Sequence, residues 1–171
     1  VKSGLMIIDQ HKAHIRILFD KYIAQIQQRK GVSQRVLFPE VLELSAAESA
    51  SLPSLLDDLE SLGFELSHLG NHSFAVQGVP SEIENVDASL LIRTIIGKSM
   101  ETGSDVKEAI QEAMALSFAA MTAIPYERVL TSEEMLLMVS QLFATKTPTY
   151  TPDGQRVISM ISDQDIEKKM Q

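Results

Sequence analysis

Short apolar runs and apolar residues at helical spacing alternate along the chain. The run from Leu5 to Ile8 contains no polar position, so we expect a strand that is buried on both faces. Asp9 follows as a favourable N-cap, because a carboxylate accepts the free N–H groups of a first helical turn. Residues 10–30 then predict a long helix that Gly31 ends. Its apolar stripe consists of Ile15, Leu18, Tyr22 and Ile26.

The middle of the chain predicts short helices, a hairpin and a further helix. Ser45 and Glu48 have the spacing of a capping box, and leucines from 52 to 62 form a helical stripe that ends at Gly63. The runs 64–69 and 73–79 flank a Gly-Asn turn signal and predict a hairpin. Leucines and isoleucines between 90 and 96 predict one more helix.

The last third of the chain predicts two helices, a strand and a short final helix. Residues 105–123 form a helical pattern rich in small residues, with Ala120 on its buried side. Thr131 and Glu134 form a capping box before a helix at 132–145. The expected core face of that helix is Met135, Met138, Val139, Leu142 and Phe143. A strand at 157–161 and a short helix at 163–171, capped by Ser162 or Asp163, complete an α+β fold.

Composition limits the classes of function. The 171 residues are 44% hydrophobic and 22% charged, which fits one globular domain or two small lobes. A net charge of −8 argues against a domain that grips DNA by itself, because such domains carry a basic stripe. The absence of cysteine excludes disulfides and thiolate zinc sites and is compatible with the cytoplasm. No apolar run has the length of a membrane span, so we expect no membrane partner.

The strand-to-helix junction carries a recognisable motif. Asp9-Gln10-His11 followed by Ala13, His14 and Arg16 resembles the DQHAAHER signature of the C-terminal domain of MutL DNA mismatch repair proteins. Further stretches in the order of that family extend the resemblance over essentially the whole chain. The resemblance implies a dimerisation lobe of mixed sheet and helices, built from 1–40 and 115–171, and an inserted external lobe at 41–114. It also implies a strand or two before Leu5, and we expect this chain, which begins at Val1, to be a fragment.

The resemblance also implies a function. We expect a homodimerisation and partner-binding module that joins two N-terminal ATPase lobes, which alone would bind ATP, and needs no cofactor of its own. The implied partners are a second copy, other mismatch repair proteins and the replication sliding clamp, with DNA contacted weakly or through the full-length protein. The implied location is the bacterial cytoplasm, with the nucleoid as the place of action.

One short stretch resembles the family's clamp-binding element, which has the pattern Gln-x-apolar-apolar-apolar-Pro. The bland alternative is an ordinary strand that stops at a proline. In an extended segment, apolar side chains can enter a pocket while the glutamine bonds at its rim. The matching residues are Gln34, Val36, Leu37, Phe38 and Pro39.

Many members of the family also nick DNA at a metal site built from three segments, and this chain departs from their pattern at the ligands. The glutamate needed for cleavage falls on Ile15, and the cysteine of the ACxxAIK segment falls on Ala120. In the CPHGRP turn, Thr151 replaces the cysteine and Asp153 the histidine. Isoleucine and alanine offer a cation nothing, and threonine is a poor zinc ligand. The retained Asp9, Gln10 and His11 therefore look vestigial, and we expect no enzyme.

An alternative function is a metal-dependent nicking endonuclease with non-standard ligands. Asp9, His11, His14 and Asp153 are all ligand types, and the resemblance would bring Asp153 near the junction. Oxygen and imidazole ligands suit Mn²⁺ or Mg²⁺. The simpler interpretation is that both histidines are hydrogen-bonding groups at the helix start.

Overall fold

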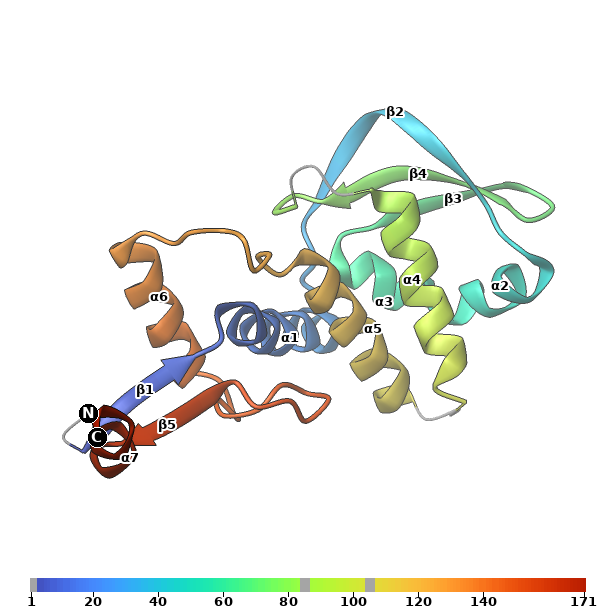
Figure 1. The fold of residues 1–171 in the computed structure, drawn as a ribbon. Coiled ribbons are helices and arrows are strands. Elements are labelled where there is room, and N and C mark those ends of the chain that lie inside the picture. The colour runs from blue at the N-terminus through green and yellow to red at the C-terminus, as the bar shows by residue number, and fades with distance from the viewer. Residues whose placement is uncertain (1–2, 84–86, 104–106) are drawn as a thin grey trace. The chain divides into compact units, whose positions relative to one another are not determined.

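A computed structural model describes residues 3–83, 87–103 and 107–171. These residues form an α+β fold of seven α-helices, one 3₁₀ turn and two small antiparallel sheets (Figure 1). They divide into two compact units, one built from 1–20 and 123–171 and the other from 21–122. Residues 21–40 and 115–122, assigned to the dimerisation lobe from the resemblance, therefore belong to the second unit.

The first unit contains a two-stranded sheet and the chain segments around it. Strand β1 (Gly4–Ile8) leads through Asp9 into helix α1 (Gln10–Gln28), whose first half lies in this unit. Helix α6 (Ser132–Phe143), strand β5 (Ile158–Ser162) and helix α7 (Asp163–Met170) complete it. Strand β5 pairs antiparallel with β1, so that Met6 lies opposite Met160. Both described sheets are antiparallel, which corrects the prediction of a mixed sheet.

The second unit is a three-stranded sheet with helices. Strand β2 (Ser33–Glu43) pairs with β4 (Ser73–Pro80), which pairs with β3 (Glu65–Gly70). Helix α2 (Ala46–Ser51), the 3₁₀ turn Leu52–Ser54 and helix α3 (Leu56–Leu62) connect β2 to β3. Helices α4 (Ala88–Glu101) and α5 (Lys107–Thr122) pack against each other. The hairpin β3–β4 and the capping box of Ser45 and Glu48 confirm the sequence predictions.

The core of the second unit is larger than the sequence pattern indicated. Phe118 is fully buried, stacks on Tyr22 with ring centroids 4.1 Å apart, and contacts Phe64. Burial raises the pKa of the Tyr22 phenol, whose oxygen is 3.2 Å from the Thr122 hydroxyl. The buried face of α5 is thus centred on Phe118, and Ala120, predicted to be buried, is exposed. The first two residues of the predicted helix at 105–123 lie outside the described residues.

Two glycines mark close approaches in the second unit. Helix α1 ends at Gln28, and Arg29 takes the left-handed turn with φ of 53°, so the prediction that Gly31 ends the helix is wrong. A side chain at Gly31 would instead collide with the Ser61 carbonyl oxygen. Gly63 ends α3 with φ of 101°, as predicted.

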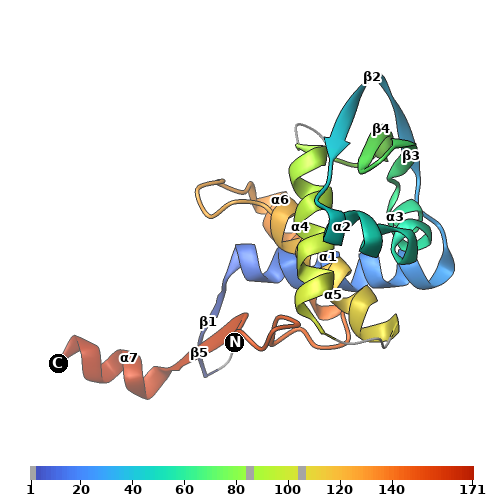
Figure 2. The same cartoon turned by 90° about the vertical axis from the view of Figure 1, so that its right-hand side faces the viewer.

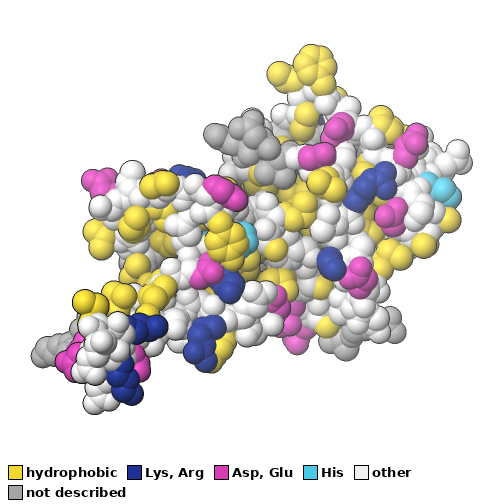
Figure 3. Space-filling model, in the orientation of Figure 1, with side chains coloured by type: hydrophobic (Ala, Val, Ile, Leu, Met, Phe, Trp, Pro, Cys, Tyr) yellow, Lys and Arg dark blue, Asp and Glu magenta, His cyan; other side chains and the backbone are white. Residues whose placement is uncertain are grey.

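The core of the first unit is small. One buried cluster consists of Ala13, Leu142 and Val157, with Ile8, Ile17, Met138 and Ile158 partly buried around it. Leu18, Ile124 and Leu130 of this unit are also buried. The prediction that β1 is covered on both faces is wrong for this chain, because Leu5 is 52% and Ile7 45% exposed. The predicted core face of α6 is confirmed for Leu142, which is buried, and in part for Met138. It is wrong for Met135, Val139 and Phe143, which are exposed. In Figure 3 hydrophobic side chains gather over α6 and over β1.

Candidate functional site

The start of α1 is fixed by Asp9 and the strand before it. The Asp9 carboxylate accepts the N–H of Lys12 at 3.0 Å, which confirms the predicted N-cap. The Lys12 ammonium lies 3.7 Å from the other carboxylate oxygen. The N–H of Asp9 donates to the carbonyl of Val157 at 3.0 Å. The helix start is therefore fastened to the residue that precedes β5.

Three side chains of the motif hold the segment at 124–128. The Gln10 amide donates to the Arg128 carbonyl at 2.7 Å. His11 Nδ1 lies 2.7 Å from the Ile124 carbonyl oxygen, and the Ile124 N–H donates to His14 Nδ1 at 2.8 Å. Because a carbonyl only accepts and an N–H only donates, Nδ1 carries a proton on His11 and none on His14. Both histidines are therefore hydrogen-bonding groups at the helix start, as the simpler interpretation predicted. They contact the carbonyl and the N–H of the same residue, Ile124, so Nδ1 donates on His11 and accepts on His14.

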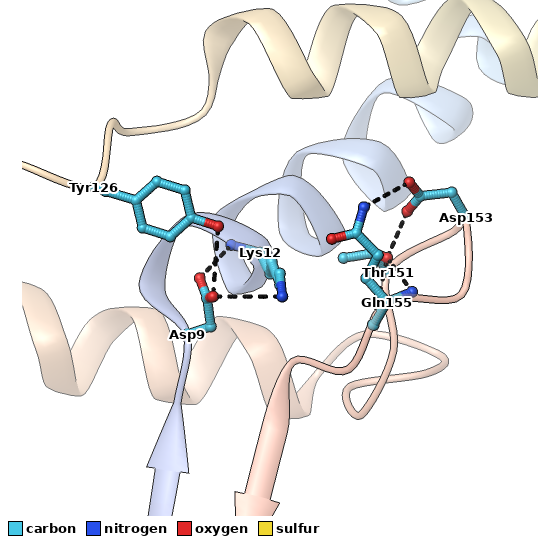
Figure 4. Close-up of polar contacts among 6 residues, drawn as sticks. All are labelled: Asp9, Lys12, Tyr126, Thr151, Asp153 and Gln155. Carbon is cyan, nitrogen blue, oxygen red and sulfur yellow. Dashed lines mark hydrogen bonds and ion pairs between the residues drawn. The ribbon is translucent and has the colours of Figure 1, made fainter.

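Tyr126 covers this junction, and the sequence analysis did not identify it. Its ring packs against the His11 ring with centroids 4.6 Å apart, and its hydroxyl lies 3.5 Å from the Asp9 carboxylate (Figure 4). The only signal in the sequence was its position next to Pro125, just after the segment that resembles ACxxAIK.

Arg16 connects α1 to the loop before β5. Its side chain is buried, donates to the Tyr150 carbonyl at 2.8 Å and pairs with Asp20 at 2.9 Å. Asp20 also accepts the Lys146 N–H at 3.1 Å. Asp20 thus satisfies both an arginine side chain and a backbone amide.

The turn at 151–155 is closed by its own side chains (Figure 4). The Thr151 hydroxyl, in a side chain that is almost fully buried, donates to the Asp153 carboxylate at 2.5 Å. The same hydroxyl accepts the Gln155 N–H at 2.8 Å, and the Gln155 amide donates to Asp153 at 3.0 Å. The hydrogen bond from Thr151 is the main reason why the pKa of Asp153 is lowered, with smaller contributions from Gln155 and the charge of Lys12.

The predicted ligand positions differ in the atoms that their side chains offer a metal ion. Among the described residues no three His, Cys, Asp or Glu side chains form a group that could hold a metal ion. Ile15 is half-buried in α1, and Ala120 is exposed in the other unit. Neither Ile15 nor Ala120 offers an atom that binds a metal ion.

The predicted clamp motif lies on β2 of the second unit. Gln34 pairs with Val79, and the register between β2 and β4 then shifts between Arg35 and Glu40. The residues from Val36 to Pro39 lie in this irregularity, with Leu37 90% and Phe38 87% exposed. Hydrophobic side chains form a protrusion at the bend of β2 in Figure 3.

Comparison with known proteins defines the class first. A family model described as the MutL C-terminal dimerisation domain matches residues 1–130. The chain therefore belongs to the family of MutL C-terminal dimerisation domains, and is such a domain of a DNA mismatch repair protein.

Three similar proteins all carry the name DNA mismatch repair protein MutL. The DNA mismatch repair protein MutL of Bacteroides fragilis is 54% identical over 168 residues, which are 98% of this chain and 27% of that protein. That of Parabacteroides distasonis is 50% identical over 169 residues, 99% of this chain and 28% of that protein. That of Porphyromonas gingivalis is 35% identical over the whole chain, again 28% of that protein. In the part of the chain that the structure describes, no helix is long and apolar enough to cross a membrane.

The hydrogen bond from Thr151 predicts the behaviour of Asp153. Replacing Thr151 with Val removes the donor and should raise the pKa of Asp153 back toward its ordinary value of 3.8. A lowered pKa stabilises the fold above that ordinary value, and this contribution disappears as the pH falls through the folded-state pKa. The variant should therefore lose less stability on acidification than the unmodified chain does. Carboxyl NMR shifts against pH measure the pKa, and Thr151→Ser, which keeps the hydroxyl, is the control. An unchanged pKa in Thr151→Val would contradict this account.

Proposed function

We propose that this chain joins two copies of a MutL-type protein through an apolar face on its first unit, and that the joined copies bring together ATPase lobes outside this chain. The observation that carries the proposal is the large apolar side chains that β1, β5 and α6 leave exposed. We call these residues the apolar face. They are Leu5, Met6, Ile7, Met135, Leu136, Leu137, Val139, Phe143 and Met160.

Exposing such a face to water is energetically unfavourable for an isolated chain. Apolar surface contributes roughly 25 cal/mol for each Å² removed from water, and contiguous apolar patches on monomers are usually small. Leu136 on α6 is the most exposed residue of the face, with 71% of its surface exposed. Leu142 is the one residue of α6 that is buried. A two-stranded sheet such as β1–β5 is also marginally stable by itself. A second copy supplies the missing cover, as the dimerisation family implies, and Leu5 to Ile8 would then be buried as their pattern predicts.

Dimerisation serves a mechanical role in this proposal. The chain spans about 27% of the length of its MutL relatives, so the rest of the protein must supply any ATP-driven step. A permanent link raises the effective concentration of the two missing regions for each other. The link needs no bond chemistry.

The dimer proposal predicts the effect of a charge on the apolar face. Leu136→Asp should raise the dimer dissociation constant by roughly tenfold or more, because the interface would then bury an unpaired carboxylate. Leu90→Asp is the matched control, since Leu90 is 54% exposed on α4 of the other unit. Sedimentation velocity over a concentration series measures both. Equal dissociation constants for the two variants would count against this face.

We further propose that the bend of β2 binds the replication sliding clamp. Leu37 and Phe38 are the apolar anchors, and Gln34 at the start of the irregularity bonds at the rim of the pocket. The contact is small and therefore weak. The double variant Gln34→Ala with Leu37→Ala should weaken clamp binding by roughly tenfold or more in surface plasmon resonance. Leu69→Ala, at an exposed leucine of β3, should leave it unchanged. Clamp binding that survives the double variant would remove this proposal.

We also propose that the chain is not a nuclease. Support comes from apolar Ile15 at the position of the required glutamate and from Thr151, whose hydroxyl is already used by Asp153 and Gln155. Without a bound ion there is no group to lower the pKa of an attacking water. Supercoiled DNA incubated with the purified chain and manganese should stay unnicked, and Asp9→Asn should not differ. Metal-dependent nicking that Asp9→Asn abolishes would instead support the endonuclease alternative.

A further inference from the structure

Helix α7 has well-satisfied ends and no buried residue. Its N-terminus has a capping box, in which Ser162 and Asp165 exchange hydrogen bonds, and its last turn carries Lys168 and Lys169. These features suit the helix dipole. Helices of eight residues are nevertheless marginal in water without packing, and none of the residues of α7 is buried. The contacts that α7 makes within the chain therefore bury none of its residues.

The apolar side chains of α7 lie on one side. Ile166 and Met170 are one turn apart, with Ile166 37% and Met170 83% exposed. Helix α7 contacts β1 and β5 and then runs away from the end of their sheet (Figure 2), while Met6 and Met160 of these strands are exposed opposite each other. Since α7 begins at the residue after β5, its apolar side chains follow Met160 of the apolar face closely in sequence.

We propose that α7 is an arm that packs on a second copy of this chain, with Ile166 and Met170 against α6 of the partner. This inference rests on the proposed dimer and names a part of it. Charge supports α6 as the receiving surface. The first turn of α6 carries Glu133, which is exposed, and Glu134, which is partly buried and pairs with Arg128, while the last turn of α7 carries Lys168 and Lys169. By two-fold symmetry each copy gives one arm and receives one.

The test introduces charge on either side of α7. Ile166→Asp combined with Met170→Asp should raise the dimer dissociation constant by at least about tenfold in sedimentation velocity. Gln164→Asp adds a carboxylate to the opposite side of the same helix and should change it less than about twofold. Circular dichroism of all variants checks that the fold is retained.

A second measurement does not depend on a variant. Amide hydrogen exchange of residues 163–170 in the unmodified chain should become at least about tenfold slower at concentrations above the dissociation constant than below it. Equal protection of α7 at both concentrations, or an unchanged dissociation constant in the double variant of a chain that does dimerise, overturns the arm alone. A chain that stays monomeric overturns both the arm and the proposed dimer.

Discussion

The hydrogen bonds at the start of α1 hold the first unit together. Asp9 fastens the helix to Val157, and Gln10, His11 and His14 fasten it to the segment at 124–128. One turn later Arg16 reaches the loop before β5. These bonds join segments more than a hundred residues apart in the sequence, while the apolar core beside them is small. Polar contacts thus set the geometry of a unit whose apolar side chains remain largely outside.

The side chains of the motif at this junction have structural roles of their own. The glutamine and histidines at this junction have structural partners, so their presence does not require a metal ion. The turn at 151–155 is closed by Thr151, Asp153 and Gln155 without any ligand. We propose that the scaffold persists because the dimer needs it: β1, β5 and α6, which carry the apolar face, all meet α1 or its neighbours in this unit.

The sequence predicted local structure well where a single residue decides it. The caps at Asp9, Ser45 and Thr131 and the turn after β3 follow from side-chain hydrogen bonds or backbone freedom, and the structure confirms them. Burial was predicted less well. The stripe on α6 predicted a core face, but periodicity cannot tell a face buried in the same chain from one left for another chain. Tyr126 and Phe118 were missed because their partners, His11 and Tyr22, lie about a hundred residues away.

The proposed dimer requires that a second copy covers the apolar face. Sedimentation equilibrium of the unmodified chain at micromolar concentrations tests this directly. The predicted result is a molar mass that rises with concentration to twice the 18.9 kDa of one chain. A mass that stays at 18.9 kDa over the whole concentration range would contradict it.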